Sequence, residues 1–190
     1  MDALNELITN LLNLLGTWGA LLGCVFILFE SMIPILPLSV FITLNFMTFG
    51  NLVGFLISWF FTICGCMISY FIFKNGVSKK LYKKIKDNPK LNKVVNIIEN
   101  ISFSNLVILI AIPFTPAFLV NIAAGICKID TKKYLSALIL GKISLVYFWG
   151  YIGVSLIESI KNPMILIRVG IIVLIMYLIS LIFSKKLNLK

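Results

Sequence analysis

An acidic residue isolated in an apolar run is the feature of this chain with the clearest chemical potential. Glu30 lies in Phe29-Glu30-Ser31-Met32-Ile33-Pro34-Ile35-Leu36-Pro37, and no other acid occurs between Glu6 and Asp87. A carboxylate in an apolar site is poorly solvated in its charged form and tends to bind a proton. Glu30 is therefore a candidate protonation site, or a counter-ion to Lys142. The alternative is an acid at a membrane surface.

Two pairs of prolines interrupt apolar stretches in the two halves of the chain. Pro34 and Pro37 form the first pair, and Pro113 and Pro116 form the second. Proline has no N–H group and clashes with the preceding helical turn, so two prolines three residues apart break a helix. In lipid, the backbone groups that a break frees must be satisfied by protein or by a wet cavity.

Residues that can form a helix follow each proline pair, at about 38–49 and 117–126. The N-terminus of a helix presents free N–H groups and a partial positive charge, which favour an anion. Ser39 and Thr115 add hydroxyl donors at these positions. We therefore expect a pocket that binds a phosphate group. The alternative is that the prolines only shape two packed hairpins.

The composition indicates an integral membrane protein. The chain has 190 residues, of which 60% are hydrophobic and 13% charged, and its mean hydropathy is +1.05. A soluble domain is nearer to half apolar and one quarter charged, and a core of this size could not bury so much apolar surface. Soluble classes of protein are thereby excluded.

The net charge of +10 invites a nucleic-acid interpretation, but the positions of the charges argue against it. Most lysines lie in residues 74–93, 128–133 and 185–190, which all border apolar stretches. Lysines in short loops mark the cytoplasmic side of a membrane protein and attract anionic lipids. We expect no nucleic-acid partner.

The apolar pattern divides the chain into an amphipathic interfacial helix at residues 1–16, a membrane domain at 17–184 and a basic cytoplasmic tail at 185–190. Stretches long enough to span a bilayer occur at residues 51–73, 135–157 and 164–184. The long basic loop, residues 74–104, shows helical patterning at 79–86 and 91–98.

The two broken stretches, residues 17–49 and 105–126, are predicted to re-enter the membrane from opposite faces. Only this arrangement places every basic segment and the C-terminus on the cytoplasmic side, as the positive-inside rule requires. The predicted fold is therefore an all-α polytopic membrane protein, with two re-entrant broken hairpins in an inverted repeat and about three spanning helices. Such repeats are typical of secondary transporters.

These motifs, taken in order, resemble the DedA family, also called VTT-domain or SNARE-associated membrane proteins, and especially its vacuolar-protein-like branch. The matching positions are Phe29 to Ser31, Pro34, Pro37, Gly50, Gly65 to Phe71, Lys74, Gly76, Pro113, Pro116, Asn121, Gly125, Lys132, Tyr134 and Trp149. The resemblance implies facing re-entrant hairpins and movement of lipid between leaflets. In bacteria the implied cargo is undecaprenyl phosphate or a phospholipid, and the implied location is the plasma membrane.

One position departs from the family pattern. The family usually has an arginine three residues before the first proline of the second pair, where this chain has Ile110. The two intramembrane cations that could replace it are Lys142 and Arg168. Such residues usually face a partner or a cavity, although near the end of a span they can also reach toward the headgroups. The second explanation is the better one for Arg168, and both stay open for Lys142.

Other residue types carry weaker signals. Cys24, Cys64, Cys66 and Cys127 are expected to be buried hydrophobes, since no histidine accompanies them to form a zinc site. Trp18, Trp59, Trp149, Tyr70 and Tyr134 are expected to anchor span ends at the membrane interface. Gly19-x-x-x-Gly23 and Gly50-x-x-x-Gly54 could mark internal packing or a homodimer contact.

The sequence therefore predicts a lipid translocase that binds the phosphate headgroup of a membrane lipid, with no catalytic residues, cofactor or metal. The residues expected to line its substrate path are Glu30, Pro34, Pro37, Ser39, Pro113, Thr115, Pro116, Asn121 and Lys142. The alternative is a proton-coupled transporter of small solutes or ions with the same architecture. A membrane scaffold without transport, and an enzyme acting on lipid phosphate, rank lower.

Overall fold

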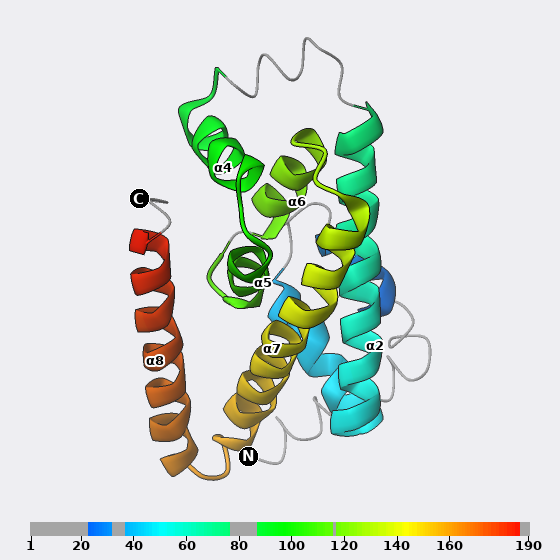
Figure 1. Cartoon of the computed structure of the whole chain (residues 1–190). Helices are drawn as coiled ribbons and strands as arrows, with labels where there is room; N and C mark the ends of the chain where they lie inside the picture. The colour runs from blue at the N-terminus through cyan, green and yellow to red at the C-terminus, as the bar shows by residue number, and fades with distance from the viewer. Residues whose placement is uncertain (1–22, 32–36, 77–86, 116, 187–190) are drawn as a thin grey trace.

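The computed structural model describes residues 23–31, 37–76, 87–115 and 117–186, and every regular element within them is a helix (Figure 1). The all-α class predicted from the sequence is thus confirmed for these residues. The predicted interfacial helix at residues 1–16 and the helical pattern at 79–86 lie outside the described residues. So do Pro34 and Pro116.

Helix α2, Leu38–Gly76, is two antiparallel arms joined at Gly50, where the backbone leaves helical geometry at φ 77° and ψ 172°. Glycine adopts this positive φ without steric cost, which explains the sharp break. The arms pack closely: the Asn45 amide nitrogen donates to the Ser58 hydroxyl at 3.0 Å. A Cβ atom on Gly54 would lie 2.4 Å from the Asn45 carbonyl oxygen. The predicted short helix at 38–49 and long helix from 51 are both present.

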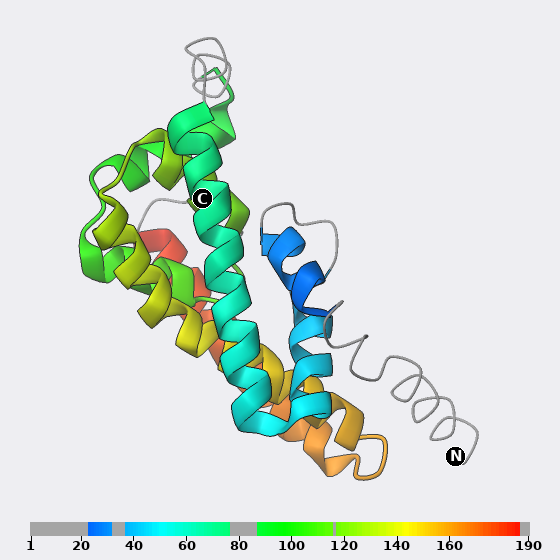
Figure 2. The ribbon, with the colours of Figure 1, turned by 90° about the vertical axis from the view of Figure 1, so that its right-hand side faces the viewer.

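The helical segment 23–31 runs beside the long arm of α2 and ends near its middle (Figure 2). A Cβ atom on Gly23 would lie 3.4 Å from the side-chain oxygen of Asn45, and one on Gly65 would lie 2.7 Å from the Ser31 Cβ. Segment 23–31 and the short arm of α2 therefore run in opposite directions, at the end of the molecule where Gly50 lies.

The second half of the chain, like the first, has short helical segments before a long helix. Helix α4, Pro89–Glu99, is followed by α5, Phe103–Ala111, and by α6, Ala117–Ile126, with the second proline pair between α5 and α6. The long helix α7, Thr131–Glu158, comes next, and α8, Met164–Lys186, closes the described chain. The predicted helix at 117–126 is confirmed.

Helix α7 runs antiparallel to the long arm of α2. Near its start, Thr131 accepts a hydrogen bond from Lys74 at 2.8 Å. In its middle, the Ile139 carbonyl accepts one from the Trp59 ring at 3.1 Å. Later, Gly150 lies against Phe46 of the short arm. The long arm of α2 and helix α7 thus form an antiparallel pair, with one end at Gly50 and the other at Gly76.

Helices α5 and α6 pack at the Gly76 end, opposite to segment 23–31 and the short arm. A Cβ atom on Gly125 would lie 2.6 Å from the Tyr70 carbonyl, and one on Gly141 would lie 2.8 Å from the Ile110 Cβ. The two proline-broken segments therefore approach each other from opposite ends of the α2–α7 pair. Their re-entry into a membrane, and the inverted repeat, stay predictions.

Three helices of the described chain are long and apolar enough to cross a membrane, in agreement with the three predicted spans: Leu38–Gly76, Thr131–Glu158 and Met164–Phe183. Helix α8 is the least covered, with 11% of its most apolar window buried. It packs on α7 through a small cluster that contains Phe148, Ile152 and Val169.

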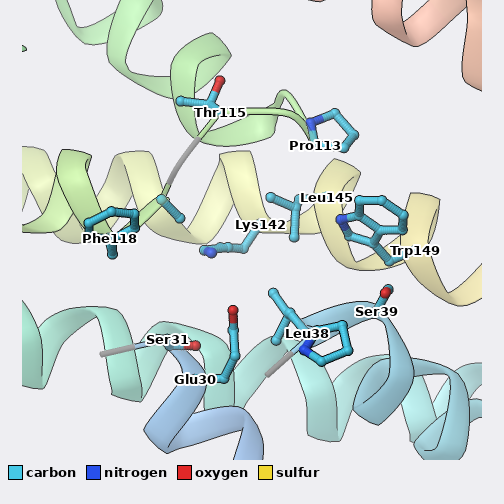
Figure 3. Close-up of a pocket in the computed structure, with 12 residues that line it drawn as sticks. Glu30, Ser31, Leu38, Ser39, Pro113, Thr115, Phe118, Lys142, Leu145 and Trp149 are labelled. Atoms are coloured by element: carbon cyan, nitrogen blue, oxygen red, sulfur yellow. The ribbon is translucent and has the colours of Figure 1, made fainter. Parts of the chain in front are cut away.

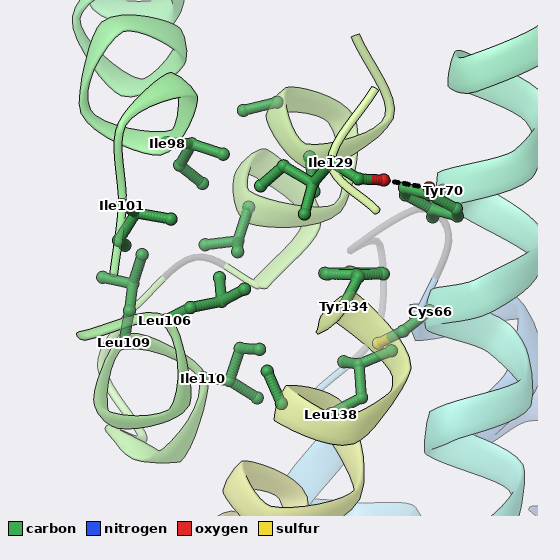
Figure 4. Packing of buried hydrophobic residues seen from close by; sticks show 14 of the residues in the cluster. Cys66, Tyr70, Ile98, Ile101, Leu106, Leu109, Ile110, Ile129, Tyr134 and Leu138 are labelled. Carbon is green, nitrogen blue, oxygen red and sulfur yellow. Dashed lines mark hydrogen bonds between the residues drawn. The ribbon is translucent and has the colours of Figure 1, made fainter. Parts of the chain in front are cut away.

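The largest buried cluster joins α2, α4, α5, α6 and α7 at the Gly76 end (Figure 4). Tyr70 and Tyr134 stack within it with ring centroids 4.7 Å apart, and both are 0% exposed. The Tyr70 hydroxyl donates to the Ile129 carbonyl at 2.5 Å. The prediction that these two tyrosines anchor the membrane interface is wrong, because their hydroxyl groups bond within the protein.

The close approach at Gly54 makes a testable prediction. In the Gly54→Ala variant the added methyl group overlaps backbone atoms of the short arm, so we expect the free energy of unfolding to fall by about 1–3 kcal/mol. Thermal unfolding in detergent measures this change. The matched control is Gly76→Ala, since nothing lies within 4 Å of a Cβ atom at Gly76. Equal midpoints for the two variants would contradict the close packing of the arms.

Candidate functional site

A cavity of 360 Å³ lies where the two broken segments approach each other (Figure 3). Segment 23–31, the start of α2, the start of α6 and the middle of α7 all contribute to its wall. The lining residues are Glu30, Ser31, Pro37, Leu38, Ser39, Pro113, Thr115, Ala117, Phe118, Lys142, Leu145 and Trp149. Six of the predicted site residues meet here, namely Glu30, Pro37, Ser39, Pro113, Thr115 and Lys142.

Lys142 supplies the cation of the cavity. Its side chain is 1% exposed, and among the described residues its ammonium group has no hydrogen-bond or ion-pair partner. A charged group inside a membrane protein costs about 2.5–3.5 kcal/mol on insertion scales and usually faces a partner or a cavity. Burial of the Lys142 charge is therefore unfavourable, and no hydrogen bond to a described residue offsets its free-energy cost.

Glu30 faces the same cavity from the opposite wall. It is half-buried at the end of segment 23–31, and its charge interacts with that of Lys142 on α7 (Figure 3). The cavity thus holds one acid and one base on different elements, with space between them. Glu30 and Lys142 thus face each other across the cavity, and the two roles predicted for Glu30, a protonation site or a counter-ion to Lys142, both stay predictions.

The N-termini of two helices also reach the cavity. Leu38 and Ser39 begin the short arm of α2, and Ala117 and Phe118 begin α6; all four residues line the cavity wall. A helix leaves its first N–H groups without partners inside the helix, and these groups attract an anion. The two N-termini therefore add partial positive charge on both sides of the Lys142 ammonium group.

Asn121 does not line this cavity. It is 1% exposed; its amide nitrogen donates to the Ser31 carbonyl at 3.1 Å, and its amide oxygen accepts from the Tyr134 hydroxyl at 2.6 Å. Asn121 thus joins α6 to segment 23–31 and to α7. The structure gives it two protein partners, while its predicted contact with a substrate stays a prediction.

A second cavity of 10 Å³, about the size of one water molecule, lies beside Lys142. Ile110, Thr115 and Asn121 are among its lining residues. Ile110 occupies the position where the resemblance expects an arginine, so Lys142 supplies a cation next to that position. Arg168 is exposed on α8, as expected of a side chain that reaches toward the headgroups.

Sequence reasoning missed Leu145 and Trp149, which line the cavity with Lys142. These residues follow Lys142 at positions i+3 and i+7, so they share its helix face, and this spacing was available in the sequence. Sequence reasoning also missed Ser31, which lines the cavity. Nothing in the sequence indicated that its carbonyl group would accept a hydrogen bond from Asn121. Within the described ranges, no three metal-ligating side chains lie together.

Comparison with known proteins now identifies the family. The family model described as the VTT domain matches residues 33–155. The chain belongs to the VTT-domain family, also called DedA. It is 31% identical over 170 residues to the uncharacterized membrane protein YhjE of Bacillus subtilis (strain 168), covering 90% of this chain and 81% of that protein. No solved structure matches the chain.

The match to the VTT domain includes all of α2, α4, α5 and α6 and nearly all of α7. Most walls of the 360 Å³ cavity therefore lie within the VTT domain. Glu30 and Ser31 come just before the matched residues.

The charges of the cavity make a stability prediction. The double variant Glu30→Gln/Lys142→Met removes both charges while it keeps side-chain volume, so we expect the free energy of unfolding to stay equal or to rise by about 1–3 kcal/mol. Thermal unfolding in detergent measures the change.

The matched control is Glu158→Gln/Lys161→Met at the exposed end of α7. We expect this pair to change the unfolding free energy by less than about 0.5 kcal/mol. A clear loss of stability in the cavity variant alone would show that its charges hold the fold together, and would contradict a binding role.

Proposed function

We propose that this protein moves a lipid with an anionic phosphate headgroup between the leaflets of a bacterial plasma membrane. The observation that carries the proposal is the buried ammonium group of Lys142, which makes no hydrogen bond to the described residues and faces a cavity between the two broken segments. The ammonium group and the starts of two helices lie at the cavity wall, and Ser39 and Thr115 are among its lining residues. Together they form the kind of site that a phosphate group prefers.

In this proposal the broken segments are re-entrant hairpins that enter from opposite membrane faces as an inverted repeat. The contacts of segment 23–31 with Gly65, and of α5 with Gly141, support this arrangement, because each hairpin stops part-way along a long helix. Non-helical backbone at membrane depth is tolerated where it lines a cavity. The headgroup would occupy the cavity while the lipid tails stay in the bilayer.

The positions of the basic residues support a cytoplasmic location for the Gly76 end. Lys74 bonds to Thr131 at this end, and Lys133 donates to the Ile101 carbonyl at 2.7 Å. Phe183 near the end of α8 packs on the same buried cluster, so Lys185 lies toward this end too. The positive-inside rule then orients the protein.

Glu30 supplies the coupling step of the proposal. A bound phosphate brings negative charge into the cavity that Glu30 lines, and two negative charges in an apolar site repel each other. Protonation of Glu30 removes this repulsion. Binding of the lipid headgroup would thus be accompanied by uptake of a proton.

The first functional prediction concerns Lys142. In proteoliposomes, Lys142→Met should slow leaflet exchange of a fluorescent phospholipid or of a polyprenyl phosphate by roughly tenfold to a hundredfold. A hydrogen bond to a charged group is worth about 1.5–3 kcal/mol, which corresponds to this range. The control is Arg168→Gln, which removes an exposed cation of α8 and should leave exchange unchanged.

The second functional prediction concerns Glu30. Glu30→Gln should abolish lipid translocation and its dependence on pH while membrane insertion stays intact, because glutamine cannot exchange a proton. Exchange is measured at several pH values, and insertion by protease protection. Full translocation by this variant would remove the proton-coupling hypothesis.

A proton-coupled transporter of small solutes or ions is the second candidate function. The cavity volume of 360 Å³ lies within the range of small-molecule sites, and this observation favours the second candidate. Solute uptake measured in the same proteoliposomes separates the two candidates. Uptake of a small anion without exchange of lipid would favour the second one.

A further inference from the structure

A buried polar link joins the two broken segments beside the 360 Å³ cavity, which Ser31 also lines. It consists of the Ser31 carbonyl, the Asn121 amide and the Tyr134 hydroxyl, with distances of 3.1 Å and 2.6 Å between successive partners. All three residues are at most 5% exposed. Ser31 and Asn121 are 90 residues apart in the chain, so the link is a tertiary contact.

One side of the polar link is fixed in the rigid core. Tyr134 stacks on Tyr70, whose hydroxyl bonds to the Ile129 carbonyl and accepts a hydrogen bond from Lys74 at 2.8 Å. Asn121 is held by Tyr134 through its amide oxygen. The other side, Ser31, ends the segment 23–31, which packs on α2 at Gly65 and belongs, through Ile27, to a second buried cluster with α2 and α7.

The polar link lies between the cavity and the Gly76 end of the molecule. Ala117 and Phe118 line the cavity, Asn121 follows one turn later, and Gly125 contacts the end of α2 at Tyr70. Ser31 lines the cavity from the opposite segment. The hydrogen bond from Asn121 to the Ser31 carbonyl therefore connects the two broken segments on the side of the cavity that faces the Gly76 end.

We infer that the polar link is a gate that closes the cavity toward the Gly76 end and must open in each transport cycle. This inference rests on the proposed function, since a gate requires a cargo. The contact between Ser31 and Asn121 is a single hydrogen bond between neutral groups, so it can break without the cost of separating buried charges. When it opens, Tyr134 keeps Asn121 oriented for closure.

The test joins the two sides of the gate by a reversible covalent bond. A variant without native cysteines carries Ser31→Cys and Asn121→Cys, and a short bis-methanethiosulfonate reagent cross-links them. We expect cross-linking to lower lipid exchange in proteoliposomes at least tenfold, and reduction to restore the rate of the same variant before cross-linking.

The matched control carries Asn45→Cys and Ser58→Cys, which replace a side-chain hydrogen bond of 3.0 Å between the two arms of α2. Cross-linking of this pair joins residues on one side of the gate and should leave exchange unchanged. Equal exchange before and after cross-linking of the Ser31–Asn121 pair would overturn the gate. Equal inhibition of both pairs would also overturn it.

A second measurement separates failure of the gate from failure of the proposed function. Ser39→Cys in the background without native cysteines places a thiol in the cavity, and a membrane-impermeant thiol reagent is added from the Gly76 side. Tyr134→Phe removes the hydroxyl that holds Asn121, so labelling should become roughly 2- to 10-fold faster, the range set by one hydrogen bond.

The control for this measurement is Tyr70→Phe, which removes another buried tyrosine hydroxyl but leaves the link intact. Its labelling rate should not change. If the protein exchanges no lipid but Tyr134→Phe speeds labelling, the gate stands and the proposed cargo is wrong. If labelling is unchanged by Tyr134→Phe, the gate is wrong whatever the cargo.

Discussion

The free-energy cost of holding polar groups in an apolar interior constrains this structure throughout. The chain leaves helical geometry at residues 112–115, between α5 and α6, and one ammonium group is withdrawn from solvent on α7. Each of these features is unfavourable by itself in lipid. The fold places the ammonium group, the Glu30 carboxyl group and the starts of two helices at one cavity, among lining residues that are mostly apolar. The two charged groups of the cavity therefore lie on different elements and face each other across it.

The buried amide groups that do not line the cavity form hydrogen bonds with other groups of the protein. Asn45 bonds to Ser58 and Asn121 bonds to Ser31 and Tyr134, so these buried amides are used for packing. Both asparagines follow a proline pair on a short helix, yet their partners differ. Asn45 joins two arms of one helix, whereas Asn121 joins the two halves of the chain. The halves of the protein thus share an order of elements without sharing all of their contacts.

Sequence analysis predicted the short helices, the three long apolar helices and the helix break at the second proline pair because proline and hydropathy act locally. It named a counter-ion to Lys142 as one of two roles for Glu30, because an isolated charge in an apolar segment usually faces a partner or a cavity. It could not predict the contact of Asn121 with Ser31, or the burial of Tyr70 and Tyr134. These depend on which helix faces meet, and an amphipathic tyrosine at a span end fits both a membrane interface and a core.

The break at Gly50 has a mechanical consequence. The short arm of α2 extends about 18 Å from this residue, at about 1.5 Å for each of roughly 12 residues. Gly54 and Asn45 are in close contact near this reversal, and Leu38 lies at the far end of the short arm, on the cavity wall. Gly150 and Gly153 of α7 lie against Phe46 and Thr43, so the short arm is held between the long arm and α7. By reversing the chain, one glycine thus fixes where the start of the short arm stands at the cavity.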